Sequence, residues 1–215
     1  MNNTDKLKDL VVDYYRKRGQ IRKRLKSFKA LGKSEDKDIF EELCFCILTP
    51  QSKASSCDKA VKELIKRGIL YDGRKKQIRD RLKGVRFPNN KTQHLLCARK
   101  LFKIEKNIEI KSRVNLKDPQ KAREWLVKNV KGLGYKEASH FLRNIGYGDN
   151  LAILDTHILK NLKRFSVIKK IPSSMTKKRY LEIEDRMRRF SDIIKIPMSE
   201  LDLLFWSKET GMIFK

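Results

Sequence analysis

The amino-acid sequence predicts an all-α protein, and three observations support this prediction. Apolar residues recur three or four positions apart through most of the 215 residues, as on the buried face of a helix. Glycine and proline are sparse, at 10 and 5 residues, and stand mostly where these apolar runs end. Only the run 151–154 resembles a strand, and it is too short to form a sheet by itself.

Six helices are expected before residue 110, because apolar residues at helical spacing alternate there with glycine, proline and polar stops. They cover, in order, residues 4–18, 21–31, about 35–48, 52–67, 78–82 and 95–108. Gly19 separates the first two helices, and Pro50 ends the third. Proline and asparagine mark the stretch 84–90 as a loop.

Five more helices are expected in the second half of the chain. They cover residues 119–130, 135–145, 156–165, 180–190 and 199–210. Asp118 is placed to cap the first of them, with Pro119 in its first turn, and Gly211 stops the last. A linker is expected near 169–174.

The charge balance indicates a protein that binds a polyanion. Lysine and arginine number 52 against 26 aspartate and glutamate residues, which gives a formal net charge of +26. Such a surface attracts nucleic acid in a salt-dependent way. A charge-rich thermophile surface explains many charges but not a twofold excess of one sign. A cationic membrane-binding protein is a third class, which the lack of a strongly amphipathic stretch disfavours.

The length and the hydrophobic fraction of 40% are enough for one large domain or two small ones. No signal peptide or membrane-spanning run is evident, so we expect a cytoplasmic protein. The sequence has four cysteines, Cys44, Cys46, Cys57 and Cys97, and they lack the spacing of a zinc or iron–sulfur site. We therefore expect no metal and no other cofactor, and buried free thiols at Cys44, Cys57 and Cys97.

The turn Gly132-Leu133-Gly134 joins two of the expected helices. The first N–H groups of a helix have no partner within it, and together with the helix dipole they form an anion site. Glycine lets a phosphate approach the backbone, and Lys131 adds positive charge. An ordinary helical corner explains the turn alone, but the net charge favours a hairpin that holds DNA.

Lys136 falls in the first turn of the second hairpin helix, where the helix dipole disfavours a cation. An uncharged lysine is a nucleophile that forms Schiff bases. Asp155 is placed to cap the helix 156–165 with one oxygen, and the other can stabilise a cationic sugar-like transition state. Taken singly, Lys136 is better explained as a solvated surface lysine and Asp155 as a plain helix cap, and only the motif favours the catalytic roles.

The order of these residues resembles the helix-hairpin-helix/Gly-Pro-Asp superfamily of DNA glycosylases. Within it, residues 130–147 and the tail are similar to the compact 8-oxoguanine DNA glycosylase/AP lyases, with further similarity at 42–49, 178–184 and 199–203. The resemblance implies a single unit over 1–215, made of two helical lobes with a DNA-binding cleft between them. A central lobe would span about 33–130 with the hairpin at 120–146, and residues 1–32 and 147–215 would form the second.

The resemblance also implies roles for individual residues. Lys136 matches the catalytic lysine of the superfamily, and Asp155 matches its catalytic aspartate. Contacts to the DNA backbone would come from Lys131, Gly132, Leu133, Gly134 and, near the flipped nucleotide, His157. Lys215, as the C-terminal residue, would help to recognise the oxidised base. Trp206 would lie close to that pocket, although a place in the core explains it equally well.

Two segments depart from the compact family. Residues 49–53 look more like the corresponding segment of endonuclease III-type enzymes, whose glutamine enters the DNA, so Gln51 is a candidate wedge. Arg86 and Phe87 form a second candidate wedge in the loop 84–90. The loop 146–150 has no proline, unlike many superfamily members, and the iron–sulfur cysteines of endonuclease III are absent.

The resemblance therefore implies a monomeric base-excision-repair enzyme that removes 8-oxoguanine from double-stranded DNA. A Schiff base at Lys136 would make it bifunctional, and β-elimination would then cut the strand 3′ to the lesion. Two alternatives stay open at this point. One is the same fold acting on oxidised pyrimidines, and the other is a helix-hairpin-helix module that binds DNA without catalysis.

Overall fold

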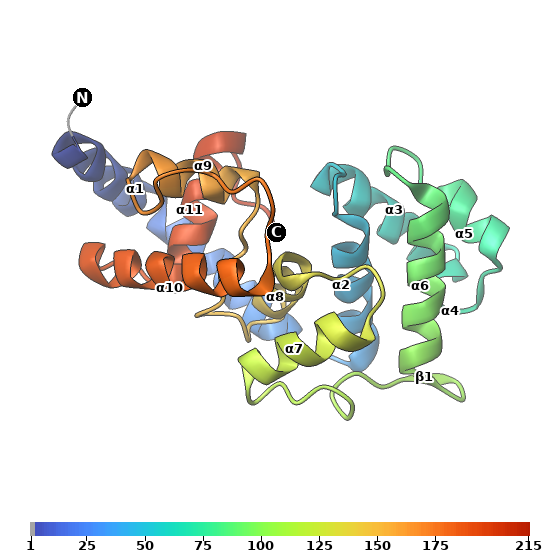
Figure 1. Ribbon diagram of the computed structural model, residues 1–215. Coiled ribbons are helices and arrows are strands. Elements are labelled where there is room, and N and C mark those ends of the chain that lie inside the picture. Colours follow the sequence, from blue (N-terminus) through green and yellow to red (C-terminus); the bar gives the residue numbers. More distant parts are fainter. Residues whose placement is uncertain (1–2) are drawn as a thin grey trace.

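The computed structural model describes residues 3–215, and nearly all of its regular structure is helical (Figure 1). The helices are α1 (Asn3–Leu31), α2 (Asp36–Leu48), α3 (Ala54–Lys66), α4 (Ile69–Asp72), α5 (Lys75–Arg81), α6 (Pro88–Phe102), α7 (Pro119–Asn129), α8 (Tyr135–Asn144), α9 (Thr156–Arg164), α10 (Lys177–Ile194) and α11 (Met198–Thr210). Within the described residues, the only sheet pairs β1 (Lys103–Ile104) with β2 (Asn107–Ile108). The predicted all-α class is confirmed.

The helices form two lobes, each around its own hydrophobic core. One cluster of buried residues runs from Ile39 to Leu151 and draws on α2 to α8. The other combines Leu10 to Phe28 of α1 with residues 152–205 of the C-terminal half. In Figure 1, α1, α9, α10 and α11 lie on one side and α2 to α6 on the other. The two lobes expected from the sequence are present, whereas the residue ranges expected for each lobe stay a prediction. Residues 1 and 2 lie outside the described part.

The two helices expected before residue 32 are one continuous helix, so the predicted stop at Gly19 is wrong. A glycine inside a helix costs about 1 kcal/mol relative to alanine. The buried residues Leu10, Tyr14, Ile21 and Phe28 keep helical spacing across Gly19 and pack into the second core. Their burial outweighs the local preference, at about 1.5–3 kcal/mol for each large apolar side chain.

The helix expected over 95–108 is also different, since α6 begins at Pro88 and ends at Phe102. Lys103 pairs with Ile108 and Ile104 with Asn107 in a short antiparallel hairpin, whose turn includes Glu105 at φ +50°. The short helix α4 was not expected. Residues 151–154 are extended but join no sheet among the described residues.

Cys44 and Cys57 are buried free thiols as predicted, whereas Cys97 is only partly buried. Burial raises the pKa of the Cys44 thiol well above its ordinary value and that of Cys57 to about 11, so both remain protonated. Between residues 3 and 215, every helix falls short of the length and apolar character that a bilayer crossing requires.

Candidate active site

The expected helix-hairpin-helix is formed by α7, the turn 130–134 and α8. Asp118 caps α7 by accepting a hydrogen bond from the Lys121 N–H, as the sequence predicts. Gly132 has φ +88°, and a Cβ atom there would lie 2.4 Å from Nδ1 of His94. The turn therefore requires glycine both for its backbone conformation and for its contact with His94.

The hairpin turn is anchored on one side and exposed on the other. Leu133 is buried in the first core, whereas Lys131, Gly132 and Gly134 are exposed. Gly134 is the N-cap residue of α8, and its N–H donates to the Glu137 carboxylate at 3.2 Å. The turn thus presents glycine backbone and one lysine charge on a rigid support, which suits an anionic ligand.

Lys136 lies in the first turn of α8, and its side chain is 26% exposed. Its Nζ is 2.9 Å from Oε1 of Glu137. Lys136 lies close enough to Lys91 and His140 for its charge to act on both groups.

Asp155 caps α9 as predicted, and its Oδ1 accepts a hydrogen bond from the Ile158 N–H at 2.8 Å. Two side chains of α10 hold the extended segment before it. The Tyr180 hydroxyl donates to the Ala152 carbonyl at 2.6 Å, and the Ala152 N–H donates to the Glu184 carboxylate at 2.8 Å. The position of Asp155 therefore depends on α10.

A buried ion pair connects this segment to the hairpin. Arg123 of α7 donates to both oxygens of Glu184 at 2.6 and 2.9 Å, and both side chains are almost fully buried. Arg123 also donates to Ser139 of α8 at 3.2 Å. Ser139 lies one turn after Lys136, so Arg123 links the helix of Lys136 to the segment of Asp155.

A second buried acid lies near Asp155. Asp202 of α11 is 4% exposed and lies 3.6 Å from a guanidinium nitrogen of Arg143. Burial raises the pKa of Asp202 to about 7; the Arg143 charge opposes this rise and the Asp155 charge adds to it. Asp155 and Asp202 are thus within electrostatic reach of each other.

The end of the described chain lies against the first lobe. Nζ of Lys215 is 3.0 Å from Glu42 and 2.9 Å from Asp58, and it lies 4.3 Å from the centroid of the Phe45 ring. The Phe45 ring also meets His140 edge-on, and Nε2 of His140 is buried without a partner. Lys215 therefore lies in the part of the first lobe that contains His140, near Lys136.

Burial lowers the pKa of His140 well below its ordinary value, and the charges of Arg143, Lys136 and Lys215 lower it further. His140 is therefore neutral at neutral pH. Trp206 is partly buried, and its ring stacks on Phe214 of the tail at 6.4 Å between centroids.

The remaining predicted residues lie on exposed loops or helix ends. Nδ1 of His157 is 3.8 Å from the Glu209 carboxylate, beyond hydrogen-bond distance. Gln51 is exposed with φ +55°, and Phe87 is 50% exposed with φ +57°. The Arg86 guanidinium lies 5.5 Å from the centroid of the Phe87 ring.

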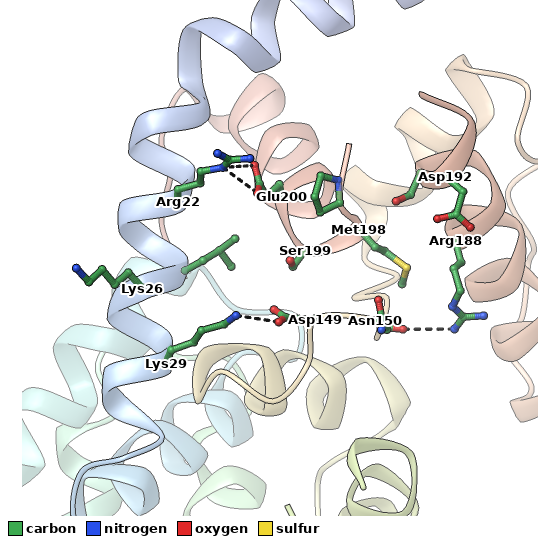
Figure 2. A pocket seen from close by; sticks show the side chains of 13 residues that line it. Arg22, Lys26, Lys29, Asp149, Asn150, Arg188, Asp192, Met198, Ser199 and Glu200 are labelled. Carbon is green, nitrogen blue, oxygen red and sulfur yellow. Dashed lines mark hydrogen bonds and ion pairs between the residues drawn. The ribbon is translucent and has the colours of Figure 1, made fainter. Parts of the chain in front are cut away.

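A pocket of about 490 Å³ lies elsewhere, between α1, α10 and the start of α11 (Figure 2). Its charged side chains are largely paired, Arg22 with Glu200 and Lys29 with Asp149. None of the residues predicted for catalysis or DNA binding lines it. The chemistry of the hairpin is therefore not located in this pocket.

Sequence reasoning missed four buried charged residues of this region, namely Lys91, Arg123, Glu184 and Asp202. A usable signal was present in each case, because each stands on the apolar face of its helix. Lys91, for example, precedes Leu95, Ala98 and Phe102 at helical spacing, and all four are buried. A charged residue at such a position marks a buried polar contact.

Two helical lobes, a glycine hairpin, a lysine in the first turn of its second helix and an aspartate capping a later helix define a helix-hairpin-helix DNA glycosylase. The profile of one family, described as 8-oxoguanine DNA glycosylase, matches residues 21–196. The chain belongs to this family.

Curated relatives match along most or all of the chain. A Fusobacterium nucleatum 8-oxoguanine DNA glycosylase/AP lyase is 45% identical over 217 residues and covers 100% of both chains. A Methanocaldococcus jannaschii protein of the same name is 39% identical over 197 residues and covers 91% of each chain.

Solved structures agree with this assignment. The 8-oxoguanine DNA glycosylase of Thermotoga maritima matches with a TM-score of 0.86 at 34% identity, over 100% of both chains. The Methanocaldococcus jannaschii 8-oxoguanine glycosylase/lyase, in complex with DNA containing 8-oxoguanine, matches with a TM-score of 0.82 at 37% identity, over 92% of this chain and 93% of that one.

The pH dependence of stability should reveal the buried Asp202 carboxyl. Its pKa rises from an ordinary 3.8 to about 7 on folding, so the folded state holds the proton more tightly. The resulting stability is complete below about pH 4 and is lost as the pH rises through about 7. We therefore expect the melting temperature of Asp202→Asn, relative to that of the wild type, to be higher at pH 8 than at pH 5. Each kcal/mol of stability that the wild type loses between these pH values should shift this difference by roughly 2–4 °C.

Thermal melts of both proteins at each pH measure this difference. The exposed Asp192 on α10 provides a matched control, because Asp192→Asn should change the melting temperature equally at both pH values. A difference between Asp202→Asn and the wild type that does not vary with pH would contradict a raised pKa at Asp202.

Proposed function

We propose that this protein is a bifunctional DNA glycosylase and AP lyase that removes 8-oxoguanine from duplex DNA. The observation that carries the proposal is Lys136 at the start of α8, directly after the exposed hairpin, with Asp155 on a segment that Arg123 ties to the same helices. The names of the relatives and the 8-oxoguanine DNA bound by the Methanocaldococcus jannaschii protein support the substrate.

The DNA backbone is held by the hairpin. Gly132 and Gly134 allow phosphate oxygens to reach backbone N–H groups, and Lys131 adds charge. His157 contacts a phosphate near the flipped nucleotide, while Gln51, Arg86 and Phe87 fill the gap that this nucleotide leaves. One copy of the chain supplies every one of these groups, so we propose a monomer that acts on the chromosome in a prokaryotic cytoplasm.

The reaction begins when the damaged nucleotide rotates out of the stack. Lys136 first loses a proton, for which Glu137 provides a carboxylate at 2.9 Å. Its Nζ then bonds to C1′ while the bond from C1′ to the base breaks, and the electron pair leaves with the base, which takes up a proton. Asp155 stabilises the positive charge that develops on the sugar. The sugar ring opens to a Schiff base at Lys136, and β-elimination releases the phosphate on the 3′ side.

The proposed base pocket lies where the C-terminal tail, which follows the second lobe, meets the first lobe. The tail brings Lys215 to the first lobe, where its ion pairs with Glu42 and Asp58 hold it beside Phe45. Trp206 supplies an aromatic face near the same tail. We propose that Lys215 and Trp206 distinguish the oxidised base from normal guanine, because 8-oxoguanine differs in its hydrogen-bonding groups at the base edge.

Borohydride trapping tests the nucleophile. Reduction of the Schiff base should freeze a covalent adduct with DNA that contains 8-oxoguanine, and Lys136→Gln should abolish it because the amide cannot form an imine. Lys128→Gln changes an exposed lysine of α7 and should trap DNA at the wild-type yield. The yield is read from denaturing gels, and full trapping by Lys136→Gln would show that another amine is the nucleophile.

Asp155→Asn should bind damaged DNA normally but turn over on the order of a hundredfold more slowly, because asparagine keeps the helix cap but removes the negative charge. Single-turnover cleavage and a binding titration separate the two effects. Asp118→Asn makes the same change at the cap of α7 and should leave the rate nearly unchanged. Wild-type turnover by Asp155→Asn would remove this carboxylate from the mechanism.

Removal of Lys215 should reduce the discrimination between oxidised and normal guanine more than the affinity for DNA. The reason is that Lys215 is held beside the proposed base pocket, whereas the hairpin carries the backbone contacts. Cleavage rates on paired duplexes and dissociation constants give the two quantities. Lys170→Met, at an exposed position, serves as the control for loss of one charge. Equal losses in both quantities would indicate a merely structural tail.

A further inference from the structure

Lys91 of α6 is a lysine whose charge is enclosed by the protein. The residue is 4% exposed, and Nζ donates to the Leu48 carbonyl at 2.6 Å, the Pro50 carbonyl at 2.7 Å and the Ser52 hydroxyl at 2.8 Å. An ammonium group offers three donors, and all three find an acceptor here. A buried charge is costly unless it is fully bonded, so this arrangement is specific rather than incidental.

The three acceptors belong to one turn, which connects α2 to α3 and carries Gln51 at its tip. Gln51 has φ +55°, a conformation that residues other than glycine rarely adopt. The ammonium of Lys91 binds the chain on both sides of Gln51. It therefore offsets the cost of that conformation and fixes the backbone that carries the exposed Gln51 side chain.

A second loop lies directly before α6. Phe87 is the N-cap residue of this helix, has φ +57° and carries a half-exposed ring, and its carbonyl accepts the first helical hydrogen bond, from the Lys91 N–H at 3.1 Å. The Ser52 hydroxyl that accepts from Lys91 also accepts from the Arg86 N–H at 2.9 Å. One side chain and one shared hydroxyl thus join the turn of Gln51 to the loop of Phe87.

The position of Lys91 relative to the nucleophile adds to this picture. Burial lowers the pKa of Lys91, the Cys57 thiol opposes this, and the positive charges of Lys136 and Arg86 lower it further. The group therefore lies within electrostatic reach of both the nucleophile and the exposed loop. An enclosed lysine that served packing alone would have no reason to bind the turn of Gln51 and, through the Ser52 hydroxyl, the backbone of Arg86 beside Phe87.

We propose that Lys91 is a positioning residue that joins the Gln51 turn and the Phe87 loop into one rigid wedge, which keeps the duplex open after the damaged nucleotide has rotated out. This inference rests on the proposed function, because it assigns to these two loops the filling of the gap in the DNA. It predicts that Lys91 matters only where base pairs have to be opened.

The test compares two substrates for each variant. One is duplex DNA containing 8-oxoguanine, and the other is single-stranded DNA with an abasic site, which requires the lysine chemistry but no opening of a duplex. We expect Lys91→Met to lose on the order of tenfold to a hundredfold in kcat/KM on the duplex, since small misplacements cost this much. Cleavage of the single strand should stay within about twofold of the wild type, because Lys136 is untouched.

Two further variants and one control make the test decisive. Ser52→Ala removes the shared acceptor with little change in volume and should give the same substrate-selective loss, even where Lys91→Met fails to fold. The double variant Phe87→Ala/Lys91→Met should lose little more kcat/KM on the duplex than Phe87→Ala alone, because both changes affect one wedge. Lys100→Met alters an exposed lysine of the same helix and should change neither rate.

Equal losses on both substrates, or none on either, would overturn the proposal for Lys91, and so would fully additive effects with Phe87→Ala. These outcomes are distinct from a failure of the proposed function. In that case the wild-type protein itself would cleave neither substrate and form no borohydride adduct, and the wedge would fall with it.

Discussion

The catalytic arrangement depends on the buried ion pair between Arg123 and Glu184. Removing two charges from water is expensive, so a pair of this kind contributes little net stability, whereas loss of one partner costs about 3–5 kcal/mol. Its importance lies in what it connects. Arg123 binds Ser139 of α8 and Glu184 of α10, and Glu184 in turn binds the Ala152 N–H before Asp155. Lys136 and Asp155, the proposed nucleophile and carboxylate, come from different lobes, and this contact is one of those that set their relative position.

The same principle organises the other buried acids. Glu42 pairs with Lys215, Glu200 with Arg22 and Asp202 with Arg143, and each pair joins segments far apart in the sequence. The protein thus uses part of its basic residues to hold its acids inside, where they align helices. These buried ion pairs are neutral, so they leave the formal net charge at +26. Most of this positive charge lies on the surface, where it attracts DNA without requiring a particular geometry. The buried charges therefore fix the relative positions of the helices, and the surface charges contribute affinity for DNA.

Local features could be predicted from the sequence, because their causes lie within a few residues. The caps at Asp118 and Asp155, the glycine turn and the place of Lys136 in the first turn of α8 belong to this class. The continuity of α1 could not be predicted locally, because it depends on burial of residues on both sides of Gly19 by helices from the other end of the chain. The bonds of Lys91 and the pairing of Lys136 with Glu137 were missed for related reasons. The first needs a turn about forty residues earlier, and the second depends on a side-chain rotamer that spacing does not determine.

The tail adds a further link between the lobes, beside the Arg123–Glu184 and Arg143–Asp202 pairs, and this bears on how the proposed base recognition and catalysis are coupled. Lys215 follows α11, whose buried residues belong to the second core, yet its ammonium binds Glu42 and Asp58 in the first lobe. Any shift of one lobe against the other would strain this contact and the contact of Arg123 together. In the proposed mechanism, base recognition by Lys215 and the alignment of Lys136 with Asp155 therefore require the same arrangement of the lobes. On this proposal, a base that displaces Lys215 would also disturb the alignment of Lys136 with Asp155, so a poor fit at the base would lower the rate as well as the affinity.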